Sequence, residues 1–360
     1  MASGINEAAL TLAALEVMNT PEFILEKVFQ KGNLADLHNV QTGITMKQQI
    51  ILAGQFGKTG LLGDATCTRK TSGASSVLTQ KYWEPAGIED TLVHCQAEVD
   101  SLFKAYYTKI TQYIQRYELG SSELATFMAM LVEESMKKTI SRAVWFGDKT
   151  VAAAQAALAG LIVGGNSVYY DYINGLWSQI FAAVTALTVK KYAITENTQV
   201  TLPLQLTLAA DRALAIFEGV WALADPRLKA DPSKKLMVSG AIFENYRQSL
   251  MTKGIYTDLA YTTNGFPSLK WNGIEVVNME SIWDLDLFAD FVDNTVNNAG
   301  YLPNRVILTT PENIPVGTLN QSDFTDLEIW YEKATRTNNI GYGFSIDTKL
   351  LEEYMIVVGF

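Results

Sequence analysis

Residues 122–146 read SELATFMAMLVEESMKKTISRAVWF and predict the longest helix of the chain. Its apolar side chains recur mostly at intervals of three and four residues, which places them on one helix face. Glu123 lies near the positive N-terminal end, two lysines and Arg142 lie toward the negative C-terminal end, and Gly147 follows as a residue that often ends helices. At about 1.5 Å per residue the helix is about 37 Å long, which suits a structural spine.

The sequence before this helix predicts an arm and a projecting hairpin. Residues 1–47 carry a short apolar helix pattern that Pro21 interrupts, and we expect an N-terminal arm there. Within residues 48–98, two β-type runs are separated by five glycines between Gly54 and Gly73. Such a glycine-rich connection predicts a long flexible hairpin that buries little against its own body and finds its partner surface elsewhere.

The sequence after the helix indicates α+β organisation. Residues 151–165 are rich in alanine and glycine but shorter than the roughly 20 apolar residues that a membrane-spanning helix needs, so we expect a buried segment or connector. A compact unit is expected over residues 169–320. The predicted elements are a helix at 206–224, a strand at 235–239, a helix from the N-cap candidate Ser239 to Gly254, a strand at 271–279, a helix at 281–291, and strands at 305–310 and 354–358.

Composition narrows the function classes. The chain has 360 residues and a formal net charge of -10, which argues against a groove that binds nucleic acid by neutralising phosphates. Only 18% of residues are charged while 48% are hydrophobic, so we expect some apolar area to be buried against other chains. The two cysteines, Cys67 and Cys95, do not form a disulfide framework, and the N-terminus carries no evident secretory signal.

One glycine-rich motif invites a comparison with phosphate-binding loops. Residues 54–59 read GQFGKT directly after a strand-like run. A P-loop needs four residues between its first glycine and the Gly-Lys pair, followed by a helix, whereas only two intervene here. We therefore expect a loop tip and no ATP site.

Histidine and cysteine offer a second candidate chemistry. The chain has two histidines, His38 and His94, and neither lies in a metal-ligand pattern. His94 and Cys95 are adjacent, so on a strand they would face opposite sides. A Cys–His dyad between Cys67 or Cys95 and a distant histidine stays open, although a buried thiol beside a surface imidazole is the simpler interpretation.

Acidic residues cluster near residue 290. Asp284, Asp286, Asp290 and Asp293 could place some carboxylates on one helix face, but the glycine and terminal glutamate of a calcium-binding EF-hand are missing. We expect a solvated helix face and no metal. Glu133 and Glu134 are expected to pair with neighbouring lysines of the long helix.

The order of these elements resembles the major capsid proteins of tailed bacteriophages, which have the HK97-like fold. The resemblance covers most of residues 48–360. It rests on the arm, the hairpin and the long helix ending in AVWFGD at 143–148. Three further phrases carry it: KLMVSGAIFENY at 235–246, WNGIEVVNM at 271–279 and NRVILTTPENIPVGT at 304–318.

The resemblance implies a domain layout. Residues 1–47 would be the N-terminal arm and residues 48–98 the extended E-loop that overlaps a neighbouring subunit. Residues 99–168 and 321–360 would form the peripheral domain with its spine helix, and residues 169–320 the axial domain. The strand near 354–358 would return to the peripheral sheet.

The resemblance also implies a function. The chain would be a structural protein without enzymatic activity or cofactor that assembles with copies of itself, as hexamers and pentamers, into an icosahedral head around double-stranded DNA. It would be assembled in the host cytoplasm and end in the virion, with portal and scaffolding proteins as partners, no membrane, and only non-specific proximity to DNA. Candidate inter-subunit contacts are Lys58, Arg69, Lys70 and Trp83. The alternatives are an encapsulin-like compartment shell and a cytosolic Cys–His hydrolase.

Overall fold

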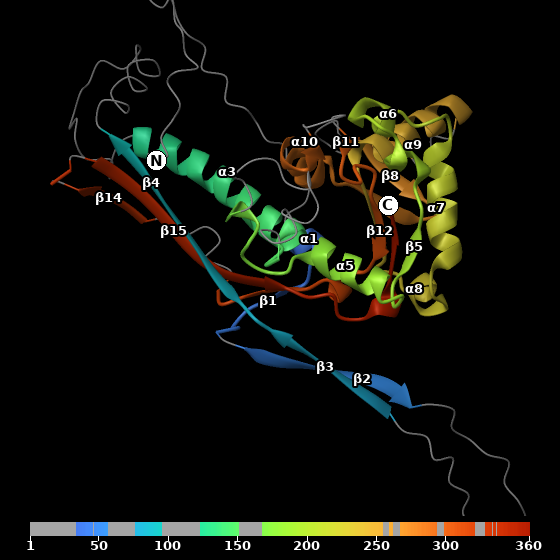
Figure 1. Cartoon of the computed structure of the whole chain (residues 1–360), viewed down its shortest axis with the longest axis horizontal. Helices are drawn as coiled ribbons and strands as arrows, with labels where there is room; N and C mark the ends of the chain where they lie inside the picture. Colours follow the sequence, from blue (N-terminus) through green and yellow to red (C-terminus); the bar gives the residue numbers. More distant parts are fainter. Residues whose placement is uncertain are drawn as a thin grey trace, which may run out of the picture.

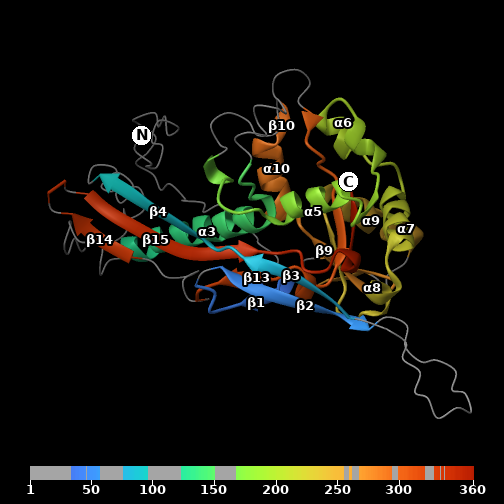
Figure 2. The same cartoon turned by 60° about the horizontal axis from the view of Figure 1, so that its bottom comes forward.

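The computed structural model describes most of the chain as two sheets with helices packed on them and a projecting hairpin (Figures 1 and 2). The larger sheet has seven strands, the other has five, and two further pairs of strands lie apart from both. The described residues are 34–45, 47–56, 76–95, 123–150, 168–254, 259–261, 267–293, 299–320, 328–332, 334–335 and 337–360.

The five-stranded sheet is built around one long strand, β15 (Thr337–Thr348). β4 (Ala86–Cys95) pairs with it along one edge. Along the other edge it pairs first with β14 (Glu328–Glu332) and then with β13 (Val316–Thr318), which also pairs with β1 (Val40–Gln41). Alternate side chains of β15 enter the core, as expected for a sheet with one covered face: Ile340, Tyr342, Phe344 and Ile346.

The spine helix covers that face of the sheet. The predicted helix is present as α3 (Glu123–Phe146), 24 residues long, and it lies along β15 (Figure 1). Met136, Ile140 and Ala143 are buried in the same core as the inward side chains of β15. Gly147 follows the last residue of the helix, and a larger residue would not fit there, because a Cβ atom would lie 2.6 Å from the carbonyl oxygens of Ala143 and Ile173.

The seven-stranded sheet carries a core on each face. Its central strands alternate strictly: Met237, Ile307 and Val358 belong to the core that includes α3, while Leu236, Leu308 and Val357 belong to a second core. The strand order is β5 (Lys190–Tyr192), β16 (Ile356–Gly359), β12 (Val306–Thr309), β6 (Lys235–Val238), β9 (Ile274–Asn278), β8 (Pro267–Trp271) and β7 (Leu259–Tyr261).

Helices pack on both faces of this sheet. α5 (Leu176–Thr185) contributes Trp177 and Ile180 to the core shared with α3, whereas α7 (Arg212–Leu223) and α9 (Gly240–Lys253) fill the second core. The shorter helices are α1 (Leu34–Leu37), η4 (Thr195–Thr198), α6 (Leu202–Leu206), α8 (Pro226–Ala230), η5 (Glu280–Asp284, a π-helix), α10 (Leu285–Asp290), η6 (Pro311–Asn313) and η8 (Glu353–Met355).

Local signals explain where the predicted elements differ from those observed. The helix predicted at 206–224 starts only at Arg212, because Asp211 before it has a left-handed φ of 61°. The strand predicted at 271–279 is two strands, β8 and β9, because Asn272 and Gly273 have φ values of 49° and 79° and form a tight turn. Ser239 precedes α9 as predicted, but its side chain makes no cap hydrogen bond.

The two sheets draw strands from regions that the predicted domain boundaries keep apart. β16, expected in the peripheral sheet, lies in the seven-stranded sheet between β5 and β12. Conversely, the five-stranded sheet takes three strands from other predicted regions: β13 from the axial region, β4 from the hairpin region and β1 from the arm. β1, β13 and β16 have two, three and four residues, and pairing with distant segments decides which sheet each one joins.

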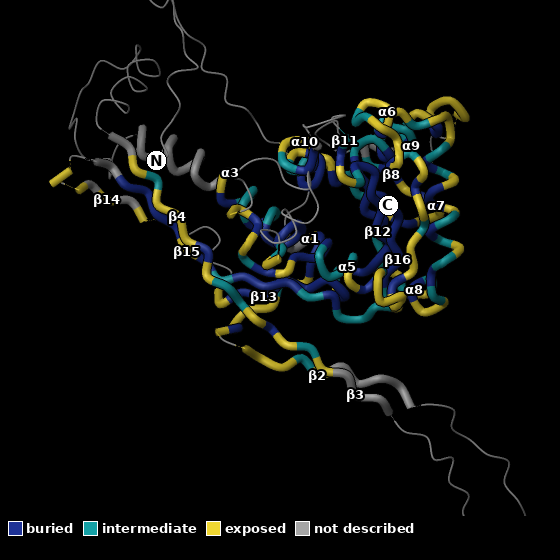
Figure 3. Tube along the Cα trace, viewed as in Figure 1, coloured by how far each residue is buried: buried dark blue, intermediate teal, exposed yellow. Residues whose placement is uncertain are grey.

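The hairpin strands leave the body of the molecule. β2 (Gln48–Phe56) pairs antiparallel with β3 (Ser76–Trp83) as a sheet of two strands, with a register shift between Ala53 and Phe56. Figure 3 shows exposed residues along its described base, in contrast to the buried runs of β12 and β16.

Candidate assembly surfaces

One face of the hairpin is open to solvent. The cross-strand register places Gln49 opposite Tyr82 and Ile51 opposite Gln80, so these four side chains share one face. All four are exposed, with Ile51 at 64% and Tyr82 at 40%. We call Gln49, Ile51, Gln80 and Tyr82 the exposed hairpin face. An apolar side chain this exposed on a two-stranded ribbon is a candidate contact with another chain.

The opposite hairpin face is anchored at its base. Lys81 donates from Nζ to the carbonyl oxygen of Leu350 at 2.5 Å and lies 3.6 Å from a carboxylate oxygen of Glu353. The backbone N–H of Glu84 donates to Oδ2 of Asp347 at 2.6 Å. These bonds hold the end of β3 to the body, while β2 and the rest of β3 pair only with each other in the described part of the chain.

Trp83 completes this anchor inside the subunit. Its side chain is 2% exposed and packs over Gly317 of β13, where a Cβ atom would lie 2.9 Å from the ring. The expectation that Trp83 contacts a neighbouring subunit therefore needs correction: the ring has its partners within its own chain. Its aromatic area fixes the point at which the hairpin departs.

The other three predicted contact residues lie outside the described residues. Lys58, Arg69 and Lys70 belong to the segment between β2 and β3. The glycine-rich motif at 54–59 is divided: its first three residues are the end of β2, and the rest lies beyond the described range.

The five-stranded sheet presents an acidic outer face. Opposite residues in an antiparallel pair share a face, and the residues opposite Gly341 and Gly343 on β4 are Thr91 and Glu89. On β14, Glu328 lies opposite Gly341, and Trp330 and Glu332 continue the same face. The outer face comprises Glu89, Thr91, Val93, Gly341, Gly343, Glu328, Trp330 and Glu332.

The sequence analysis did not predict this outer face, although the glycines and exposed apolar residues that form it are evident in the sequence. Trp330 is 41% exposed and its ring lies over Gly341, 3.1 Å from where a Cβ atom would be. Val93 is 39% exposed and occupies the same row as Trp330, with Asn339 between them. The signal was the alternation of glycine with apolar residues along β15, which leaves one face flat.

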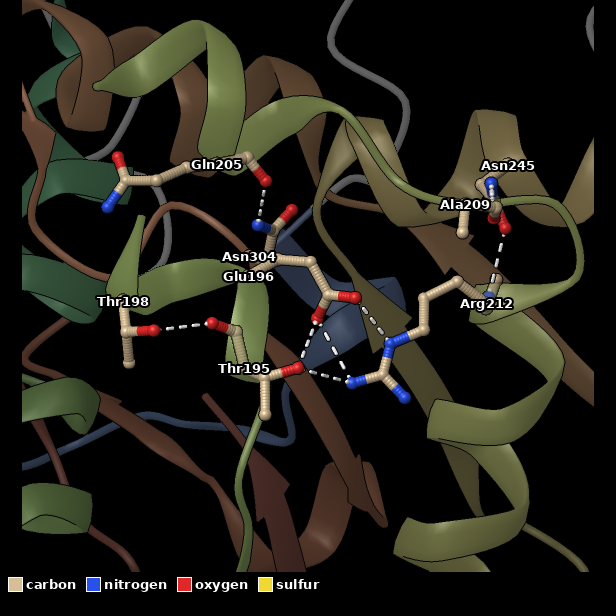
Figure 4. A network of polar contacts seen from close by, with 9 residues as sticks. Thr195, Glu196, Thr198, Gln205, Ala209, Arg212, Asn245 and Asn304 are labelled. Carbon is tan, nitrogen blue, oxygen red and sulfur yellow. Dashed lines mark hydrogen bonds and ion pairs between the residues drawn. The ribbon is translucent and has the colours of Figure 1, made fainter. Parts of the chain in front are cut away.

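A two-pronged ion pair joins η4 to the start of α7, beside the seven-stranded sheet (Figure 4). Arg212 at the start of α7 donates from Nε to Oε1 of Glu196 at 2.6 Å and from Nη2 to Oε2 at 3.0 Å. Its Nη2 also donates to Oγ1 of Thr195 at 3.1 Å. The guanidinium beside Glu196 lowers the pKa of that carboxyl against the opposing effect of burial.

Buried amides complete this brace. Gln205 of α6 donates to the carbonyl oxygen of Gly300 at 3.0 Å and accepts from its N–H at 2.7 Å. Nδ2 of Asn304 donates to the carbonyl oxygen of Gln205 at 2.7 Å (Figure 4). The segment so held exposes Val200 at 58% and Leu204 at 50%, which makes it a second candidate contact surface.

The acidic residues near 290 do not form the solvated face that we expected. Asp284 is 5% exposed and the Asp286 side chain 13% exposed, because η5 and α10 pack between the spine helix and the seven-stranded sheet. Burial raises the pKa of Asp286, and the charge of its ion-pair partner Arg142 opposes that effect. The side chain of Asp293 lies outside the described residues.

Two of these carboxylates tie α10 to neighbouring elements. Arg142 of α3 donates to Oδ1 of Asp286 from Nη2 at 2.9 Å and from Nε at 3.1 Å. The hydroxyl of Tyr170 donates to Oδ2 of Asp290 at 2.6 Å. The acidic segment of η5 and α10 therefore forms a structural bracket, because its carboxylates bind groups of the same subunit.

The candidate Cys–His chemistry gains no support from His38. The expected surface imidazole is in fact 1% exposed, with Nδ1 donating to the carbonyl oxygen of Ile314 at 2.8 Å and the ring 5.2 Å from that of Trp145. Burial lowers the pKa of His38 to about 4. His94 and Cys95 end β4, but their side chains, like Cys67, lie outside the described set.

Across the described part of the chain, every helix falls short of the length or apolar content that crossing a bilayer requires. The same residues contain no group of three or more histidine, cysteine or acidic side chains placed to hold a metal ion.

Solved structures match this chain along nearly its whole length. A structure of Microbacterium phage Oxtober96 matches with a TM-score of 0.51 and 10% identity, covering 98% of this chain and 96% of that chain. A structure of Gordonia phage Cozz has a TM-score of 0.51 and 10% identity over 95% and 91%. The capsid structure of the cyanophage P-SCSP1u has a TM-score of 0.50 and 13% identity over 99% and 95%. No protein-family model matches, and neither does any curated protein.

These similarities establish the fold. The chain has the α+β, HK97-like capsid fold that the sequence resemblance predicted. Fold alone does not assign a function, so the assignment depends on what the surfaces can do.

Proposed function

We propose that this chain is the major capsid protein of a tailed bacteriophage, which assembles with copies of itself into hexamers and pentamers of an icosahedral head. The proposal rests mainly on how the hairpin is anchored and on which of its side chains are exposed. The hairpin is anchored to its own body at the base, through Lys81, Trp83 and Glu84, and it exposes Ile51 and Tyr82 on its opposite face. On a fold shared with phage structures, this geometry suits contact with another subunit.

Charge complementarity suggests where the hairpin docks. The segment between β2 and β3, residues 57–75, contains the basic residues Lys58, Arg69 and Lys70 and one acidic residue, Asp64. The outer face of the five-stranded sheet presents Glu89, Glu328 and Glu332 around a flat glycine-lined centre. We propose that the basic segment of one subunit lies on the outer face of the next, with opposite charges steering the encounter.

The small share of charged residues in the chain, 18%, fits a shell subunit. Shell stability comes from many modest interfaces, each burying apolar area at about 25 cal/mol per Å² before the cost of association is subtracted. The formal net charge of -10 favours a container that does not grip DNA. Enclosed double-stranded DNA, a portal protein, a scaffolding protein and a place in the virion belong to this proposal.

The test is electron microscopy of the full-length chain, expressed alone and with candidate scaffolding proteins encoded beside its gene. We expect closed, uniform shells. Small monodisperse particles under every assembly condition would count against the proposal.

Two further outcomes separate the alternatives. Particles purified from the natural source should contain nuclease-protected double-stranded DNA, whereas a folded protein cargo would favour the encapsulin-like compartment. The Cys67→Ala, Cys95→Ala and His94→Ala variants should assemble as the parent does, because the proposal gives these side chains no chemical role. Loss of a hydrolase activity in those variants would favour the Cys–His alternative.

A further inference from the structure

The bracket formed by η5 and α10 contains a third carboxylate, Asp284, whose surroundings differ from those of Asp286 and Asp290. Oδ2 of Asp284 accepts the backbone N–H of Gly240, the first residue of α9, at 2.9 Å. Its Oδ1 is buried and has no hydrogen-bond partner among the described residues. Asp284 thus touches the start of α9 with one oxygen and leaves the other oxygen unused.

Asp284 lies between the two hydrophobic cores of the subunit. The preceding residue, Trp283, lies edge-on between Trp145 of α3 and Trp177 of α5, with ring centroids 5.1 Å and 5.2 Å apart. Asp284 therefore links the core around the spine helix to the helix that fills the other face of the seven-stranded sheet.

The nearest opposite charge is held back from a full ion pair. Arg305 is 1% exposed and donates to two backbone carbonyl oxygens, of Leu302 at 2.8 Å and of Tyr301 at 3.0 Å. Its guanidinium lies 4.5 Å from the ring centre of Trp177, and Nη1 has no partner within the described residues. Among the described residues Arg305 acts on Asp284 through its charge, with no hydrogen bond between the two side chains.

We propose that Asp284 is a proton-operated lock at this junction: the carboxyl group is neutral when α9 and η5 are closed on each other, and its ionisation loosens them. The lock operates inside one subunit and goes beyond the proposed shell function. A failure to form shells therefore leaves it testable, and a failure of the lock leaves the shell proposal intact.

The charged groups around Asp284 act in opposite directions. Burial is the largest influence and raises its pKa to about 7, and the negative charge of Glu280, one turn earlier and also beside Gly240, acts in the same direction. The Gly240 N–H and the charge of Arg305 oppose the rise. α3 and α5 face this junction with the rings of Trp145 and Trp177, and Asp286 is engaged by Arg142.

The sign of the pH dependence follows from linkage. An unfolded aspartate titrates near 3.8, so the folded state binds the extra proton between about 3.8 and 7. The stability that protonation contributes is complete below 3.8 and is lost as the pH rises through 7. Within the described part of the chain, the ionised carboxylate would be buried with an unpartnered Oδ1 and no ion pair, so opening the junction to water relieves the cost of burying its charge.

The test compares thermal unfolding of the full-length chain and its Asp284→Asn variant from pH 5.5 to 8.5. Asparagine can still accept from Gly240 but cannot ionise. Relative to the variant, the melting temperature of the parent should fall by about 3 °C over this range. The matched control is Asp225→Asn, because the pKa of Asp225 is lowered to about 2 by Arg227 and its charge does not change in this window. The control should follow the parent.

Parallel profiles for the parent and Asp284→Asn would overturn the proposal. If the variant does not fold, hydrogen exchange of the parent still decides it: after correction for intrinsic exchange rates, protection of the first turn of α9 should fall above pH 7 and that of α7 should not. Unchanged protection in α9 across this range would contradict the lock.

Discussion

The ring of Trp83, at the end of β3, lies directly over Gly317 of β13, so close that a Cβ atom on Gly317 would be 2.9 Å from Cε3 and Cζ3 of the ring. The same Cβ would be 2.6 Å from Cδ1 of Ile44. Trp83 at the base of the hairpin and Ile44 of the N-terminal segment therefore both pack against Gly317. The direction in which the hairpin leaves the body depends on this contact.

Gly317→Ala should destabilise the subunit by about 1–3 kcal/mol, since the added methyl group overlaps buried atoms that have little room to move. Thermal unfolding of unassembled subunits measures this. Gly343→Ala on β15 is the matched control, because its nearest atom would be at an ordinary 3.9 Å, and it should cost no more than about 0.5 kcal/mol. Equal losses in the two variants would contradict the packing described for Trp83.

His38 should make the subunit sensitive to acid. Its pKa is lowered to about 4 by burial, against 6.5 when unfolded, so the unfolded state binds the proton more readily between these values. Stability present above pH 6.5 is lost as the pH falls toward 4, by up to about 3 kcal/mol. In His38→Asn, which keeps a donor for Ile314, chemical denaturation should show a smaller loss over this range. The same pH dependence in both chains would contradict the prediction.

The ion pair between Arg142 and Asp286 should matter more than an exposed pair. Arg142→Met leaves a mostly buried carboxylate without its partner, and we expect a loss on the order of 2 kcal/mol, below the range for fully buried pairs because the Arg142 side chain is 25% exposed. Arg227→Met removes an exposed pair with Asp225 and should cost less than about 1 kcal/mol. Urea denaturation compares them, and a larger loss at Arg227 would refute this ranking.

Reversing charges on the outer face should impair assembly and spare the subunit. In a Glu328→Lys, Glu332→Lys double variant we expect an unchanged melting temperature within about 2 °C and a strong loss of shells by light scattering, because the exposed carboxylates make few contacts within their own chain. Adding Lys58→Glu, Arg69→Glu and Lys70→Glu should restore part of the assembly. Undiminished assembly of the double variant would remove the outer face from the docking proposal.

Local patterns in the sequence predicted those elements whose signals are local. The spacing of apolar residues in α3, the glycine after it and the strand–helix unit from Lys235 to Gly254 all correspond to observed elements. The turn at Asn272 and Gly273 could have been found as well, since Asn-Gly between two apolar runs favours a two-residue hairpin.

Pairing between distant segments escaped sequence analysis. Nothing in the IVVG of β16 distinguishes a strand beside β12 from one beside β15, because both sheets bury apolar strands. The acidic residues of η5 and α10 follow the spacing of a solvated face, and only the tertiary placement of Arg142, Tyr170 and Gly240 shows that their charges are used inside the subunit. The acidic outer face likewise exists only after β4, β14 and β15 are paired.

We propose that the hairpin serves contacts between subunits and contributes little to the fold of its own chain. The decisive experiment shortens the segment from Gly54 to Gly73 and images the product beside the full-length chain by electron microscopy. We predict that the shortened chain keeps the circular dichroism spectrum and melting temperature of the parent but forms no closed shells. Normal shells from the shortened chain would contradict the claim.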